Sequence, residues 1–290
     1  MAQDPETSSV TNSPIPEHML DSIIKTFILS HTEAGDQQLA QTLVYNVSRL
    51  AWRLRDAGVK TEQKTSVSDV VTEADRIAEK FVSDVLRALR PEDGLLGEEG
   101  TRHEGTSGRT WVIDPIDGTY NFTTGSDYWC SALALVKGDP DDPDELILGA
   151  VHRPAMGYTW IGGPDIPTTR DGSPVPKFQN PAPEETVLGG YLHPTHFTNP
   201  VLRDAWIAVA GQFATVRMLG SASIDLACVA GGELGCWTQH SVASWDWLPG
   251  RALVEGAGGT TTKVTAAGRT WSIAGSAKAV EAAKLALDPL

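Results

Sequence analysis

Asp114 and Asp117 are the residues of this chain whose type and spacing most clearly indicate chemistry. They lie in the segment WVIDPIDGTYNF, residues 111–122, directly after bulky and β-branched side chains that are typical of a strand. Because Pro115 has no N–H to continue a strand ladder, the strand is predicted to end at Asp114, and the rigid corner projects both carboxylates toward one point. Carboxylates held that close repel each other unless a cation lies between them. The spacing therefore predicts a metal site.

The residues after this corner suit a phosphate. Gly118 lets the backbone approach a ligand closely, and a helix that begins near Thr119 would direct free N–H groups toward an anion. Asp, Pro and Gly are also the commonest turn residues, so an ordinary turn is the alternative. The metal site is favoured because further carboxylates stand at the edges of apolar segments, namely Glu98 and Glu99, Glu73 and Asp75, and Asp246.

These segments together resemble the inositol monophosphatase family of magnesium-dependent, lithium-sensitive sugar phosphatases. The resemblance runs from about residue 39 to the C-terminus. It is carried by WVIDPIDGTYNF, by LGEE at residues 96–99, by KTSVSDVVTEAD at residues 64–75, and by Trp245-Asp246 followed by GAGG at residues 256–259. The family implies a combined α+β and α/β fold, a layered αβαβα sandwich of the inositol monophosphatase/fructose-bisphosphatase type, with the site between its two halves.

The resemblance also implies which residues hold the metal. Two magnesium ions and a third, weaker one are expected on Glu98, Asp114, the backbone carbonyl of Ile116, Asp117, Asp246 and Asp75. Thr119 and Asp75 would orient the attacking water, with Glu98 as a further catalytic residue. An all-oxygen, carboxylate-rich ligand set is what a hard cation such as magnesium prefers.

The charge of a phosphate monoester determines the expected reaction. The dianion repels hydroxide, and metal ions neutralise it, lower the pKa of water and align the attacking and leaving oxygens. Direct attack by water is predicted because no cysteine, serine or histidine motif indicates a covalent phospho-enzyme. The aspartyl-phosphate pattern is also absent, since two residues separate Asp114 from Asp117.

Several of these residues have a structural alternative. Asp75 stands three positions after a threonine and before an apolar helical pattern, so it also fits a capping box. Glu98 fits a solvated turn, and Asp246 fits the N-cap of the following helix. Lys64 and Asp69 match family positions in a loop over the site, and they also fit an ordinary polar linker.

Substrate contacts are expected from the family at Gly118, Thr119, Gly220, Ser221, Ala222, Gln239 and Asp246. Gln239 stands where inositol-selective members carry a glutamate, so a charged acceptor for hydroxyl groups is replaced by an amide. Inositol 1-phosphate is the leading substrate. Histidinol phosphate, fructose 1,6-bisphosphate and a nucleotide 3′-phosphate are the alternatives within the family, and a non-catalytic metal-binding regulatory protein is the alternative of another class.

Composition restricts the partners. The 290 residues carry a formal net charge of −14, which argues against nucleic acid and acidic membranes as partners. The N-terminus lacks a basic start and an apolar signal core, and the three cysteines have no metal or redox spacing, so a cytoplasmic protein with reduced cysteines is expected. The family is often dimeric, which implies a homodimer.

Hydrophobic periodicity divides the chain into three parts. Residues 1–17 are expected to be a disordered tail, residues 18–180 an α+β half with most metal ligands, and residues 181–290 an α/β half with Asp246 and the substrate pocket. The Pro-, Gly- and Asp-rich stretch 162–183 marks the boundary. Helices are predicted over 20–29, 37–56, after Asp75, and near 200–212, 223–231 and 247–256. Strands are predicted near 111–114, 131–136, 147–152, 187–191 and 216–219.

Overall fold

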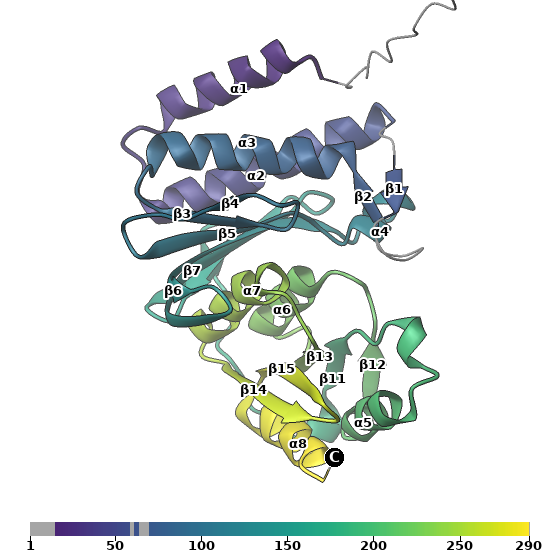
Figure 1. The fold of residues 1–290 in the computed structure, drawn as a ribbon. Coiled ribbons are helices and arrows are strands. Elements are labelled where there is room, and N and C mark those ends of the chain that lie inside the picture. Colours follow the sequence, from purple (N-terminus) through teal and green to yellow (C-terminus); the bar gives the residue numbers. More distant parts are fainter. Residues whose placement is uncertain (1–14, 59–60, 64–69, 290) are drawn as a thin grey trace, which may run out of the picture.

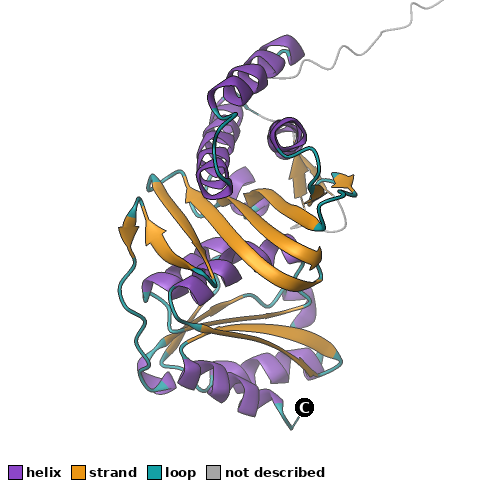
Figure 2. Cartoon of the chain, turned by 90° about the vertical axis from the view of Figure 1, so that its left-hand side faces the viewer, coloured by secondary structure: helices purple, strands orange, loops and turns teal. Residues whose placement is uncertain are grey.

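Layers of helix and sheet alternate through the molecule in the order αβαβα (Figures 1 and 2). The computed structural model describes residues 15–58, 61–63 and 70–289. The layered sandwich expected from the sequence is confirmed. The predicted tail lies outside the described residues up to residue 14, and the first helix begins at Glu17.

The outermost layer on one side consists of long helices over a large sheet. These are α1 (Glu17–Ser30), α2 (Asp36–Asp56) and α3 (Glu73–Leu89). The sheet has eight strands in the order β10-β9-β8-β7-β6-β5-β3-β4. Their bounds are β3 (Gly94–Gly97), β4 (Arg102–His103), β5 (Arg109–Asp117), β6 (Cys130–Asp139), β7 (Asp142–Arg153), β8 (Tyr158–Gly163), β9 (Ile166–Arg170) and β10 (Ser173–Pro174). Only the β3–β5 pair of this sheet is parallel.

The second sheet has five strands in the order β12-β11-β13-β15-β14. They are β11 (Val187–Gly190), β12 (Thr215–Arg217), β13 (Cys236–His240), β14 (Thr260–Ala266) and β15 (Arg269–Gly275). Helices α6 (Ala222–Gly231) and α7 (Ser244–Gly256) lie between the two sheets, and α5 (Pro200–Ala210) and α8 (Ala277–Leu287) cover the outer face of the second. The short elements β1 (Thr61–Gln63), β2 (Val70–Thr72) and α4 (Thr119–Thr123) lie together at one end of the large sheet.

Three apolar clusters hold the layers together. Leu43, Phe81 and Trp111 belong to the core under the outer helices. Trp237 and Trp247 belong to the core between the sheets, where the two indoles stack with ring centroids 5.8 Å apart. The middle core fixes α6 and α7 against both sheets, and these two helices carry second-half residues to the site.

The stretch that the sequence marks as the boundary, residues 162–183, contains β9 and β10. The chain leaves the large sheet only after Pro174, and it enters the second sheet at Val187. Gly and Pro in this stretch therefore form tight turns between short antiparallel strands as well as the connection between the sheets.

The three cysteines lie in or against the apolar clusters. Cys130, Cys228 and Cys236 are all unpaired, and Cys130 and Cys236 are buried. No helix within the described residues is long and apolar enough to cross a membrane.

Candidate metal and phosphate site

The sequence predicts that the strand carrying Asp114 ends at that residue. In the structure this strand, β5, continues to Asp117 with one irregularity. Asp114 pairs with Ala132 and Asp117 pairs with Cys130, so three steps along β5 face two steps along β6. In a regular strand, residues three apart point to opposite faces of the sheet. The extra residue of this bulge brings both carboxylates to the same side. The Pro115 carbonyl, which leaves the ladder here, accepts a hydrogen bond from the Ser131 hydroxyl at 2.7 Å.

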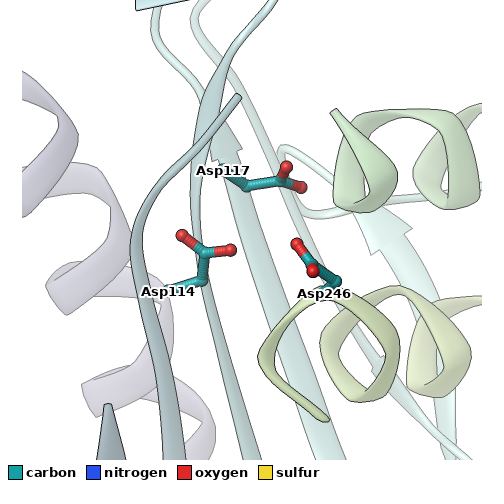
Figure 3. Close-up of side chains that lie close together, drawn as sticks. All are labelled: Asp114, Asp117 and Asp246. Carbon is teal, nitrogen blue, oxygen red and sulfur yellow. The ribbon is translucent and has the colours of Figure 1, made fainter. Parts of the chain in front are cut away.

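Asp246 reaches the same point from the second half. It is the third residue of α7, whose N-cap is Ala243, so the predicted N-cap role of Asp246 is wrong. Carboxylate oxygens of Asp114, Asp117 and Asp246 lie within 4.8 Å of one another. Figure 3 shows the side chains converging from β5 and α7. No other group of this kind was found within the described residues.

The electrostatics of this cluster favour a bound cation. Both oxygens of Asp114 are buried without a hydrogen-bond partner. Burial, followed by the charges of Glu98 and Asp117, raises the pKa of Asp114 well above its ordinary value. Burial and the charge of Asp117 raise the pKa of Asp246 to about 8. A buried carboxylate without partners costs several kcal/mol unless a metal or proton compensates it, and the all-oxygen donor set suits magnesium.

Asp117 receives part of its compensation from the second half. The backbone N–H groups of Ala222 and Ser223, at the start of α6, both donate to its carboxylate. Burial nevertheless raises the pKa of Asp117. The first turn of α6 therefore holds Asp117 in place without neutralising it.

Asp75 performs the capping role and also faces the site. Its Oδ2 accepts hydrogen bonds from the backbone N–H and the hydroxyl of Thr72, so the capping box predicted from the sequence is confirmed. The Thr119 hydroxyl lies 3.2 Å from Asp75 Oδ1 and 3.0 Å from the Ile116 carbonyl, and it can donate to either. Burial raises the pKa of Asp75 to about 6. One carboxylate oxygen of Asp75 thus caps α3, and the other lies within hydrogen-bonding distance of the Thr119 hydroxyl.

Glu98 lies on the turn after β3. The backbone of this turn is held by Glu79, which was not predicted from the sequence. The buried Glu79 of α3 accepts hydrogen bonds from the Glu99 N–H at 2.7 Å and the Thr101 N–H at 2.8 Å. The Glu98 N–H donates to the Ile113 carbonyl at 3.2 Å, which ties the turn to β5. A glutamate on the otherwise apolar face of α3 was the signal in the sequence. Glu79 therefore fixes the turn from which Glu98 projects.

Replacing Glu79 by alanine is expected to lower the free energy of unfolding by about 3 kcal/mol, because two N–H groups lose a charged acceptor. The variant should also need more magnesium for the same rise in melting temperature, since Glu98 loses its support. Urea unfolding and magnesium titration of the melting temperature measure both effects. The matched Glu79→Gln variant retains acceptor oxygen and should lose less; equal losses in both variants would contradict this role.

A cavity of about 590 Å³ opens over the cluster. The predicted site residues that line it are Glu98, Asp114, Ile116, Asp117, Gly118, Thr119, Gly220, Ser221, Ala222, Gln239 and Asp246. Asp75 lies behind Thr119. Lys64 and Asp69 lie outside the described residues. Residues from both halves thus meet in one cavity.

Other lining residues were not predicted. These include Tyr120, Tyr191, His193 and Asp225. Asp225 is buried in α6, accepts a hydrogen bond from the Tyr128 hydroxyl at 2.7 Å, and has a pKa raised by burial to about 8. An acidic residue inside the apolar run of α6 was the available signal for Asp225. The aromatic residues gave none.

Comparison with known proteins places the chain in a family. The sequence profile described as "Inositol monophosphatase family" matches residues 29–287. A Thermotoga maritima protein named fructose-1,6-bisphosphatase/inositol-1-monophosphatase is 32% identical over 203 residues, which cover 69% of this chain and 74% of the relative. A Mycobacterium tuberculosis histidinol-phosphatase is 31% identical over 205 residues, which cover 67% and 74%.

A solved structure confirms the fold. The extragenic suppressor protein SuhB from Bartonella henselae matches with a TM-score of 0.76 at 23% identity, over 86% of this chain and 96% of that one. The family profile spans most of the sequence, and the aspartate cluster that fits a metal lies inside the matched region. This chain belongs to the inositol monophosphatase family and is a phosphomonoesterase.

Proposed function

We propose that the protein is a magnesium-dependent phosphatase that hydrolyses a small polyol phosphate, with inositol 1-phosphate as the leading substrate, by direct attack of water. The observation that supports this most strongly is Asp114, a buried carboxylate with no hydrogen-bond partner beside two further carboxylates. Such a group is stable as an anion only with a cation beside it.

The carboxylates of Asp114, Asp117, Asp246 and Glu98, with the Ile116 carbonyl, are the residues proposed to hold two magnesium ions. Asp75, with Glu98, would hold a weaker third ion through water. Magnesium bound there would neutralise the phosphate and lower the pKa of water. The chain itself contributes oxygen ligands at a fixed corner, because the β5 bulge and the α6 N–H groups set the directions of Asp114 and Asp117.

Thr119 and Asp75 are proposed to position the water that attacks phosphorus. When the Thr119 hydroxyl donates to Asp75, its lone pairs remain free to accept a hydrogen bond from water. Asp75 is held on its other side by Thr72, so the direction of this hydroxyl is fixed. Together with Glu98, these residues would orient and deprotonate the water as it attacks.

The cavity supports a monophosphate rather than a bisphosphate. None of the described residues that line it is lysine or arginine. A second phosphate on the leaving group would lie near the buried Asp225 carboxylate with no described lysine or arginine of the lining beside it, which is unfavourable. Gln239, Ser221 and the backbone of Gly220 and Ala222 can instead bond hydroxyl groups.

Phosphate release from a panel of esters tests this proposal. The panel contains inositol 1-phosphate, histidinol phosphate, fructose 1,6-bisphosphate and adenosine 3′,5′-bisphosphate, each with magnesium and with a chelator. We expect turnover only with magnesium, and kcat/KM for inositol 1-phosphate at least about tenfold above that of either bisphosphate, because a single unpaired charge costs more than 1.4 kcal/mol. A preference for a bisphosphate would contradict the proposed substrate class. Absence of turnover on every member would favour the non-catalytic alternative.

A further inference from the structure

Asn121 bonds residues of both halves at the edge of the cavity. It lies in α4, lines the cavity, and its side-chain Nδ2 donates to the Tyr128 carbonyl at 2.8 Å and to the Leu219 carbonyl at 2.8 Å. The Gly220 carbonyl lies 3.3 Å from the same nitrogen. Tyr128 precedes β6 of the large sheet, whereas Leu219 and Gly220 connect β12 to α6 in the second half. One amide therefore links the two halves at the rim of the site.

The backbone around Asn121 is packed too closely for other side chains. Gly118 has a φ of 97°, and a Cβ atom there would lie 3.1 Å from both the Gly220 and the Tyr128 carbonyl oxygens. Gly220 has a φ of 84°, and a Cβ atom there would lie 3.1 Å from Asn121 Nδ2. Both glycines adopt a conformation that other residues rarely take. The close contact between α4 and residues 219–220 therefore depends on glycine at both positions.

The segment that Asn121 holds lines the cavity on the side of the second half. We call residues 218–222 the leaving-group wall. Met218, Leu219, Gly220, Ser221 and Ala222 all line the cavity. The far end of this wall is anchored because the N–H groups of Ala222 and Ser223 donate to Asp117. At its near end, the carbonyls of Leu219 and Gly220 face the Asn121 amide, and further along the wall Ser221 Oγ lies 3.6 Å from Cys130 Sγ of β6.

We infer that Asn121 is a positioning residue that fixes the leaving-group wall relative to the phosphate corner and thereby sets the affinity for the leaving group. This inference rests on the proposed function for its kinetic consequence. Loss of the amide would free the near end of the wall, while the N–H groups of Ala222 and Ser223 would still hold its far end at Asp117. Phosphate binding at the metals would then be retained, and recognition of the rest of the substrate would weaken.

Hydrogen–deuterium exchange tests the positioning directly and needs no turnover. The variants are Asn121→Ala and Asn121→Leu; the second is similar in size to asparagine but has no donor. We expect amides of residues 218–221 to exchange at least about fivefold faster in both variants, while β5 and α7 exchange as in the wild type. Asn46→Ala is the matched control, since the Asn46 amide donates to Thr42 on the exposed side of α2, away from the cavity. Unchanged exchange in residues 218–221 of either folded variant would overturn the inference.

Kinetics tests the consequence for substrate. For the best ester of the panel, KM should rise about tenfold in both variants, as expected for the loss of two hydrogen bonds, while the inhibition constant of inorganic phosphate changes less than about twofold. A parallel rise in both constants would show that Asn121 supports the metal corner instead, and would overturn the inference. If the wild type releases no phosphate from any ester, the proposed function fails, and the exchange experiment still decides the role of Asn121.

Discussion

Asparagine in place of Asp114 is expected to lower kcat/KM for phosphate release by on the order of 10³-fold and to raise the melting temperature of the metal-free protein. Activity falls because a carboxylate central to the metal cluster is lost. Stability rises because the buried carboxylate has no hydrogen-bond partner and is repelled by Glu98 and Asp117, whereas a neutral amide can donate to those neighbours. Steady-state kinetics and thermal unfolding without metal measure the two effects.

Opposite changes in activity and stability distinguish this result from simple misfolding. Asp165→Asn serves as the matched control, because Asp165 is exposed in the turn between β8 and β9, and this variant should change neither quantity. A variant at Asp114 that retains more than about a tenth of wild-type activity, or that melts at a lower temperature without metal, would contradict the assignment of Asp114 to the metal site.

The metal-free protein is expected to lose stability as pH rises from about 4 to about 8, by at least about 3 kcal/mol. Burial raises the pKa of Asp75 to about 6 and that of Asp246 to about 8, from an ordinary value of 3.8. Between the ordinary and the raised pKa, the folded state binds more protons than the unfolded state, so stability falls as pH rises. Below about pH 4 both states are protonated, and above about pH 8 the loss is complete.

Magnesium should reverse most of this loss, since a bound cation replaces the proton as the partner of the carboxylates. The rise in melting temperature that saturating magnesium produces is therefore expected to be larger at pH 8 than at pH 6. Part of the slope should remain with magnesium, because Asp225 also has a pKa raised to about 8 and lies outside the aspartate cluster. A magnesium effect of equal size at both pH values would argue against protonated carboxylates in the metal-free cluster.

The sequence predicted the residues of the site better than the geometry that joins them. Asp114, Asp117 and Asp246 do converge, and a short motif together with the family resemblance was enough to identify them. The bulge that turns Asp114 and Asp117 to one side could not be predicted, since it depends on pairing with β6, whose register no local pattern reveals. Asp246 was misplaced as an N-cap because helix starts are uncertain by a few residues.

Residues that act through long-range contacts were beyond sequence reasoning. Glu79 supports a turn 20 residues away, and Asn121 bonds a carbonyl 98 residues away. Neither partner is indicated by spacing or composition. Residues 162–183, which contain the short strands β9 and β10, are predicted to be a boundary because Gly, Pro and Asp mark turns within a sheet as well as links between sheets. Residues that bind or react can thus be predicted from a local sequence pattern, whereas residues that hold them in place through distant contacts are identified only in the folded structure.

The initial rate of phosphate release, measured as magnesium is titrated into the metal-free wild type and into Asp117→Asn, tests the central claim most directly. The wild-type rate is expected to rise from zero to a plateau, and the Asp117→Asn rate is expected to stay near zero at every magnesium concentration while the protein remains folded. A wild-type rate that persists in a chelator, or a fully active Asp117→Asn variant, would contradict a magnesium-dependent phosphatase built on this aspartate cluster.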